Sequence, residues 1–183
     1  MLISLRQAVE ILHAGDIVAV PTEAVYGLSC DPRNEQAVAA LLRLKARDVA
    51  KGFIVVASAI AQLADWVDWS QVTPAAYQQA QSVWPGPVTL VVPAQPSVSP
   101  LIRGEFTTLA VRVTAHPVLQ ALCAACGHPL LSTSANISGQ SPARTPAEIE
   151  QQWGPSMPIV EGALGGLEKP TMIIDMLTGQ RLR

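Results

Sequence analysis

The amino-acid sequence predicts a single α/β domain built on a mixed β-sheet. Short apolar runs rich in β-branched residues alternate with helix-like stretches along the whole chain. No segment is polar enough to act as a linker between two domains. The length of 183 residues also suits one folded unit, so we expect residues 1–183 to form one domain.

The expected strands are the runs at residues 17–20, 53–56, 88–92, 109–113 and 172–174. Each is short and dominated by valine, isoleucine, leucine or alanine, which is typical of strands buried on both faces. Prolines fall mainly in the segments between these runs, where they favour connections over regular structure.

The expected helices follow from apolar periodicity and from capping residues. Residues 4–14 and 35–45 place their larger apolar side chains on one face. Thr73 and Thr145 each precede a proline, so a capping hydroxyl would stand before a proline at the first helical position. Glu148, three residues after Thr145, predicts a capping box there.

Composition and charge exclude some classes of function. Charged residues make up 14% of the chain, against about 25% in a typical soluble domain, and the net charge is -2. Binding of RNA or phosphate would therefore need a local basic patch. No apolar run approaches the roughly 20 residues of a membrane span, and we expect no signal peptide because no basic region precedes an apolar stretch in the first residues. With an odd cysteine count, three, we expect a cytoplasmic protein.

The first motif that could carry chemistry is Pro-Thr-Glu-Ala-Val-Tyr-Gly at residues 21–27. It directly follows an expected strand, and ligands of open α/β sheets bind at the carboxyl ends of strands. Thr22, Glu23 and Tyr26 supply hydrogen-bonding side chains within one turn. The alternative is an ordinary turn after a strand, because turns favour such residues.

The second motif is the basic segment at residues 45–52, which contains Lys45, Arg47 and Lys51. A cation at a helix C-terminus is favoured by the helix dipole, which explains Lys45 but not Lys51, since Lys51 lies beyond the helix. The sharper interpretation is a phosphate site, because a triphosphate needs such a cluster to offset its charge during nucleotidyl transfer.

A polar segment and a buried charge complete the set of motifs. Residues 132–139 carry four hydroxyls and the Asn136 amide after an apolar run, and we interpret them as a loop that could hold phosphate oxygens or as a Ser/Asn-rich turn. Arg112 lies inside an apolar strand, where its charge must find a partner. That partner is either a structural ion pair or the carboxylate of a ligand.

Other familiar signals are absent or weak. Neither standard glycine-rich nucleotide fingerprint occurs. Cys123 and Cys126 form a Cys-x-x-Cys, but they lie on an apolar helix without a second pair, so we interpret them as packed thiols. The three histidines His13, His116 and His128 are scattered, and we predict no metal site.

Taken in order, these motifs resemble the YrdC family over nearly the whole chain. The resemblance is carried by residues 21–27, by Lys45-x-Arg47 with Lys51, by Trp-Pro-Gly-Pro-Val-Thr at residues 84–89, by Ala-Val-Arg at residues 110–112 and by residues 132–139. The length is similar to that of the short, single-domain bacterial form. This implies a twisted mixed sheet flanked by helices, related to the dihydroxybutanone-phosphate synthase α/β fold, with a large, positively lined cavity.

The resemblance also implies an activity. Members of the family are expected to make threonylcarbamoyl-adenylate from L-threonine, bicarbonate and ATP, a nucleotidyl transfer that releases pyrophosphate. The product serves the threonylcarbamoylation of tRNA adenosine, so the implied partners are the threonylcarbamoyl-transferase proteins (TsaD, TsaB and TsaE-like) that act on tRNA. ATP is then a substrate, and Mg2+ would accompany it.

The resemblance assigns roles residue by residue. Lys45, Arg47 and Lys51 would be the catalytic cations. The implied threonine-binding residues are Thr22, Arg112 and Ser132. The implied ATP-binding residues are Arg47, Lys51, Ser134, Asn136 and Arg183. Tyr26 and Thr171 are further candidates for this site.

Two other functions stay open at this point. The same basic cavity could belong to a non-catalytic module that binds double-stranded RNA or tRNA, although such modules are usually basic and this chain is not. A related enzyme acting on a sugar phosphate would need an acidic metal-binding cluster, and the sequence shows none.

Overall fold

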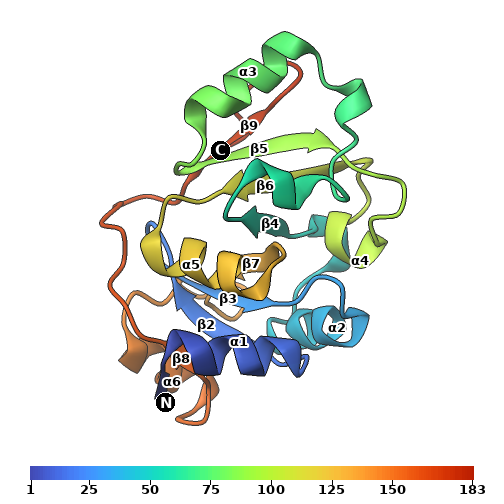
Figure 1. The fold of residues 1–183 in the computed structure, drawn as a ribbon. Coiled ribbons are helices and arrows are strands. Elements are labelled where there is room, and N and C mark those ends of the chain that lie inside the picture. The colour runs from blue at the N-terminus through green and yellow to red at the C-terminus, as the bar shows by residue number, and fades with distance from the viewer.

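A computed structural model describes residues 1–183 and shows a nine-stranded mixed sheet with helices on both faces (Figure 1). The strands are β1 Leu2–Ile3, β2 Val18–Pro21, β3 Tyr26–Cys30, β4 Ile54–Ala57, β5 Val88–Pro93, β6 Thr108–Val113, β7 Leu130–Ser134, β8 Ile159–Val160 and β9 Met172–Asp175. Their order across the sheet is β1-β8-β2-β3-β7-β4-β6-β5-β9. It contains both parallel and antiparallel pairs, so the predicted mixed sheet is confirmed.

The helices connect these strands. They are α1 Leu5–His13, α2 Glu35–Leu44, α3 Pro74–Val83, α4 Pro100–Arg103, α5 Pro117–Cys126 and α6 Pro146–Trp153, with the 3-10 turns η1 Val49–Lys51, η2 Ile60–Leu63 and η3 Trp69–Gln71. None of them combines the length and apolar character that a membrane span requires.

All five predicted strands are present within about two residues of their expected bounds, as β2, β4, β5, β6 and β9. Besides the two-residue strands β1 and β8, the sequence missed β3 and most of β7. Both contain serine, and β3 contains Gly27, so local propensity favoured loops. They form strands because each has a hydrogen-bonding neighbour on both sides. Consequently Ser132 and Ser134 belong to β7, and the polar loop begins after them, which corrects the prediction for residues 132–139.

The caps confirm the predicted helix starts, with one correction. The hydroxyls of Thr73 and Thr145 accept hydrogen bonds from backbone N–H groups of the first turns of α3 and α6. Glu148, however, accepts a hydrogen bond from the N–H of Arg144 rather than from that of Thr145. The Glu148 carboxylate thus bonds to the residue before the N-cap and not to the N-cap itself, so the capping box is not formed.

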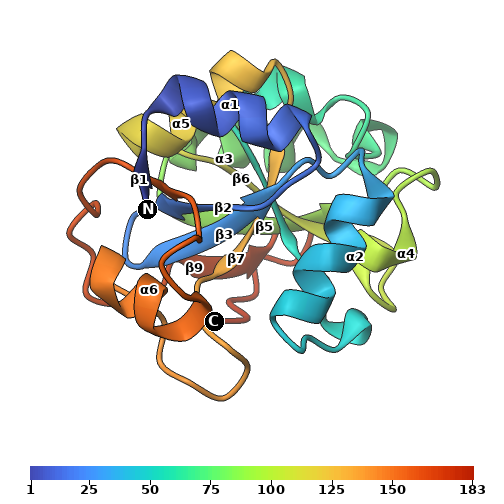
Figure 2. The ribbon, with the colours of Figure 1, turned by 90° about the horizontal axis from the view of Figure 1, so that it is seen from below.

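Alternation along the strands builds two cores. Leu130 and Val56 belong to the core under α1 and α5, whereas their neighbours Leu131 and Val55 belong to the larger core on the other face. Figure 2 shows α1 and α5 together on one side of the sheet and α6 on the other. This pattern follows from the period of two in a strand, which sends successive side chains to opposite faces.

The buried thiol of Cys123 leads to a prediction about alkaline stability. Burial raises its pKa to about 12 in the folded protein, from an ordinary value near 9. Above about pH 9 the unfolded chain therefore binds fewer protons than the folded chain, and the free energy of unfolding falls as pH rises. We expect Cys123→Ala to reduce that fall by about 1.4 kcal/mol per pH unit between about pH 9 and 11.

Urea unfolding of the wild type and Cys123→Ala across this pH range measures the difference. An identical slope in both proteins would contradict the prediction.

Candidate active site

A pocket of about 280 Å³ opens beside the ends of β3, β4 and β7. Its walls come from five separate parts of the chain. The lining residues are Thr22, Ala24, Val25, Tyr26, Gly27, Arg47, Ile54, Arg112, Ser132, Thr133, Ser134, Pro142, Pro170, Thr171 and Arg183. Three arginines and no carboxylate are among them, so the pocket is suited to anionic ligands.

Strand register places the polar side chains on one face of the sheet. Ile54 pairs with Ser132, and Val56 pairs with Arg112. Directly paired residues point to the same face, which here is the face covered by α1 and α5 over Val56 and Leu130. The pocket is the continuation of that face past the helices, where serines and an arginine take the place of apolar side chains.

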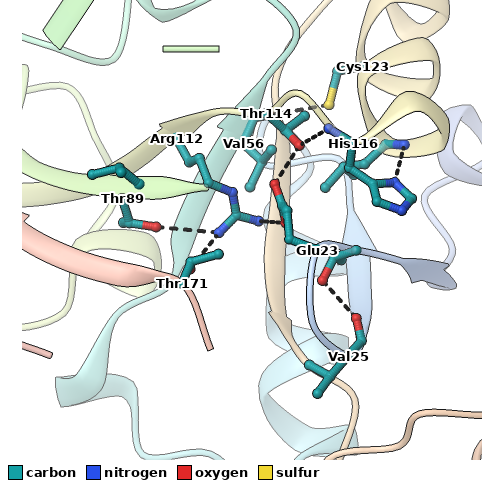
Figure 3. A network of polar contacts seen from close by, with 12 residues as sticks. Glu23, Val25, Val56, Thr89, Arg112, Thr114, His116, Cys123 and Thr171 are labelled. Carbon is teal, nitrogen blue, oxygen red and sulfur yellow. Dashed lines mark hydrogen bonds and ion pairs between the residues drawn. The ribbon is translucent and has the colours of Figure 1, made fainter. Parts of the chain in front are cut away.

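Arg112 is the centre of a buried polar network (Figure 3). Its NH1 donates to the hydroxyls of Thr89 at 3.3 Å and Thr171 at 3.2 Å, and its NH2 lies 3.2 Å from Oε2 of Glu23. Both charged side chains are buried, and Nε of Arg112 has no hydrogen-bond partner. Burial lowers the pKa of the Arg112 guanidinium, and the neighbouring Glu23 charge opposes that shift. The predicted need for a partner is thus met by Glu23.

The network continues from Glu23 into the loop that precedes β9. Thr114 donates its hydroxyl to Glu23 at 2.7 Å and accepts the N–H of His116, whose Nε2 lies 3.0 Å from the carbonyl of Ala163. The N–H of Gly165 also donates to the carbonyl of Thr22. These contacts hold the loop against the β2–β3 turn and fix one wall of the pocket.

The two other arginines of the pocket are fixed by backbone carbonyls. Arg47 donates from Nε at 3.0 Å and from NH2 at 2.7 Å to the carbonyl of Gly52, and its guanidinium lies 5.2 Å from the centre of the Phe53 ring. Arg183 donates to the carbonyl of Thr171 at 3.0 Å from NH2. Burial lowers the pKa of both guanidinium groups, so a bound anion would strengthen their charged form.

Lys45 lies underneath the pocket rather than in its wall. It is 2% exposed, and its Nζ donates to the carbonyl of Ser134 and, at 2.8 Å, to the carbonyl of Asn136. Burial, with a smaller contribution from the Arg47 charge, lowers its pKa to about 8. The lysine therefore joins the end of α2 to the segment after β7 and shapes the pocket from behind.

The structure brings most of the predicted site residues together. Those in the pocket wall are Thr22, Tyr26, Arg47, Arg112, Ser132, Ser134, Thr171 and Arg183. Lys45, Lys51 and Asn136 are not in the wall: Lys51 is exposed at the end of η1, and the Asn136 amide bonds to the carbonyls of Ile137 and Gln140.

The sequence analysis assigned no role to two of the residues in the network around Arg112. These are Thr89 and Thr114, which lie within or beside apolar strands. A polar residue in an apolar strand is the same sequence feature that drew attention to Arg112, and it could have identified them. Pro142 and Pro170 line the pocket through their place in the fold and carry no local signal. The volume is also smaller than the large cavity that was expected, since small-molecule pockets usually span about 300–1,000 Å³.

Comparisons with known proteins agree with this geometry. The Sua5/YciO/YrdC family profile, described as "Telomere recombination", matches residues 10–183. A Klebsiella pneumoniae protein named threonylcarbamoyl-AMP synthase is 47% identical over 180 residues, which are 98% of this chain and 95% of that protein. An Aliivibrio fischeri protein of the same name is 45% identical over 98% of both chains.

Among solved structures, P. abyssi Sua5 complexed with L-threonine superposes with a TM-score of 0.89 at 28% identity. The match covers 99% of this chain but 56% of that one, so the present chain spans about half of the archaeal protein. E. coli YciO superposes with a TM-score of 0.79 at 27% identity, over 93% of this chain and 82% of that one. With a family match over nearly its full length and close relatives along all of it, this chain belongs to the Sua5/YciO/YrdC family.

Proposed function

We infer that this chain is a threonylcarbamoyl-AMP synthase, which joins L-threonine, bicarbonate and ATP and releases pyrophosphate. Relatives that share 45–47% of its residues carry that name, and a structural neighbour binds L-threonine. The observation that carries the inference is the gathering of Arg47, Arg112 and Arg183 in one pocket without a carboxylate in its wall. The reaction needs such a site, because a threonine carboxylate and a triphosphate must lie side by side.

We propose that Arg112, Thr22 and Ser132 bind threonine. Arg112 lines the pocket, and the planar fork of a guanidinium can donate two hydrogen bonds to a carboxylate. Ser132 lies on the same face of the sheet, on β7, and β4 separates it from Arg112 on β6. Thr22 donates its hydroxyl to the carbonyl of Val25 at 2.7 Å, which fixes the turn that faces them.

We propose that Arg47, Arg183 and Ser134 bind the phosphates. The hydroxyl of Ser134 donates to Oδ1 of Asn136 at 2.6 Å, so Asn136 acts on the pocket by positioning this serine. Lys45 has the same role through the carbonyl of Ser134. Lys51 contributes positive charge from outside the pocket wall, so its effect on ATP binding should be smaller than that of Arg47.

The chemistry needs no protein nucleophile. The threonine amine attacks the carbon of CO2 and loses a proton to solvent, or condenses with bicarbonate and releases water, and either route gives a carbamate. A carbamate oxygen then attacks the α-phosphorus of ATP. The bond between the α-phosphorus and the bridging oxygen breaks, and pyrophosphate leaves with the electron pair. The residues of the pocket act by holding the reactants in line and by offsetting phosphate charge.

The pocket also suggests how the metal and the rest of the nucleotide are held. No carboxylate lines the wall, so Mg2+ that arrives with ATP would be bound by phosphate oxygens and water. The small volume indicates that ATP extends beyond the pocket, past Pro142, which also lines a neighbouring open cleft with Arg144. The threonylcarbamoyl-AMP would pass to a transferase that acts on tRNA adenosine.

Gly27 provides a test of the threonine end of the pocket. A Cβ built on it would lie 3.1 Å from Oγ of Ser132 and 3.3 Å from Cγ2 of Thr22, closer than ordinary van der Waals contact. We expect Gly27→Ala to raise the KM for threonine roughly 10-fold, because crowding of this kind costs about 1–2 kcal/mol. The KM for ATP is the internal control, and an equal change in both constants would contradict the assignment.

Pyrophosphate release by purified protein tests the function itself. We expect release that requires L-threonine and bicarbonate as well as ATP, with D-threonine and L-valine as inactive controls. Release independent of threonine would refute the inference. Absence of release, combined with binding of tRNA or duplex RNA, would favour the RNA-binding alternative instead.

A further inference from the structure

A second cluster of chemically active side chains lies at the far end of β3 from the pocket. His13 is the last residue of α1, Cys126 is the last residue of α5, and His128 lies just before β7. Their imidazole nitrogens and thiol sulfur lie within 4.8 Å of one another. None of the three takes part in the proposed reaction.

His128 has the hydrogen bonding expected of a metal ligand. Its Nδ1 lies 2.8 Å from the carbonyl of Pro129, which can only accept, so Nδ1 donates in this contact. The side chain is 7% exposed, and Nε2 has no hydrogen-bond partner. Metal-binding histidines usually donate their other ring N–H to a carbonyl or carboxylate in this way.

The nearby carboxylate does not satisfy this nitrogen. Oδ2 of Asp31 lies 3.4 Å from Nε2 of His128. Both oxygens of Asp31 already accept hydrogen bonds from the guanidinium of Arg33, at 3.0 Å from Nε and 2.8 Å from NH2. The buried nitrogen therefore has no hydrogen-bond partner, and it lies beside a thiol and a second imidazole.

We propose that His13, Cys126 and His128 bind one zinc-type divalent metal ion. Two imidazole nitrogens and one thiolate are ligands that zinc prefers, with water in the fourth position of a tetrahedron. Bond lengths of about 2.0–2.3 Å place such ligand atoms about 3–4 Å apart, so the cluster must close by about 1 Å. His13 is exposed and free to make that movement.

Binding involves a simple exchange at the sulfur. The Cys126 S–H bond breaks, its proton goes to solvent, and a sulfur–metal bond forms. The ion then joins the C-terminal ends of α1 and α5 to the segment before β7. Because this end of β3 is remote from Tyr26 and Gly27, the site stabilises the domain and takes no part in catalysis. The two cysteines of the Cys-x-x-Cys then have different roles. Cys126 binds the ion, whereas the thiol of Cys123 donates to the carbonyl of Val56 in the core.

Titration of protein without a histidine tag tests the site, with Zn2+ in a calorimeter and with Co2+ by absorption. We expect one ion per chain, a thiolate-to-cobalt charge-transfer band in the near ultraviolet, and a rise in the thermal midpoint on adding Zn2+. His13→Ala and Cys126→Ser should each weaken binding at least about 100-fold. His13→Ala alters an exposed side chain, so the variant is expected to fold.

Cys123→Ala is the matched control, because it removes the other thiol of the same helix and should leave both binding and the cobalt band unchanged. The proposal is overturned if no cobalt–thiolate band appears. It is equally overturned if His13→Ala and Cys126→Ser bind the ion as tightly as the wild type does.

Discussion

Replacing Arg112 with alanine is expected to abolish threonine-dependent pyrophosphate release and to lower the free energy of unfolding by about 3–5 kcal/mol. The loss of stability follows from the burial of Glu23, which would lose the guanidinium 3.2 Å away. The hydroxyls of Thr89 and Thr171 would lose their donor as well. The loss of activity follows from removal of the proposed carboxylate ligand.

A double variant separates these two effects. Arg112→Gln combined with Glu23→Gln removes both charges together, so no unpaired charge stays buried. We expect it to recover most of the lost stability and none of the activity. Urea unfolding gives the first quantity and the threonine dependence of pyrophosphate release gives the second. Recovery of activity along with stability would show that Arg112 supports the fold without touching threonine.

Replacing Arg47 with alanine is expected to lower kcat/KM for ATP by about 100- to 1,000-fold, the usual cost of one preorganised charge at a reacting phosphate. Arg47→Lys should recover little, because a lysine cannot hold the Gly52 carbonyl and a phosphate in the same fork.

Two other cations make the comparison quantitative. Lys51→Ala should reduce kcat/KM for ATP less than Arg47→Ala does, because Lys51 is exposed and outside the pocket wall. Arg43→Ala is the matched control: this arginine lies in the last turn of α2, is exposed and does not line the pocket. If Arg43→Ala and Arg47→Ala were equally impaired, the effect would be one of general charge and not of this site.

Much of the fold could be read from local patterns. Runs of β-branched residues predicted β4, β5 and β6 nearly to the residue, because a strand buried on both faces must be apolar throughout. Threonine followed by proline predicted the starts of α3 and α6, because capping is a local interaction. The strands β3 and β7 could not be predicted in this way, since their hydrogen bonds come from neighbours distant in sequence.

For the site, the sequence by itself determined which residue types had to be accounted for: a charge inside an apolar strand at Arg112, a basic segment at Arg47, and hydroxyls at Ser132 and Ser134. The tertiary structure decided which of these meet. In the folded chain Lys45 is buried behind the pocket and Lys51 is exposed outside it. Glu23 forms an ion pair with Arg112. The physical reason is that a charge within an apolar strand shows from the sequence alone that a partner is needed. Which distant residue becomes that partner depends on strand order and register, which the sequence does not show locally.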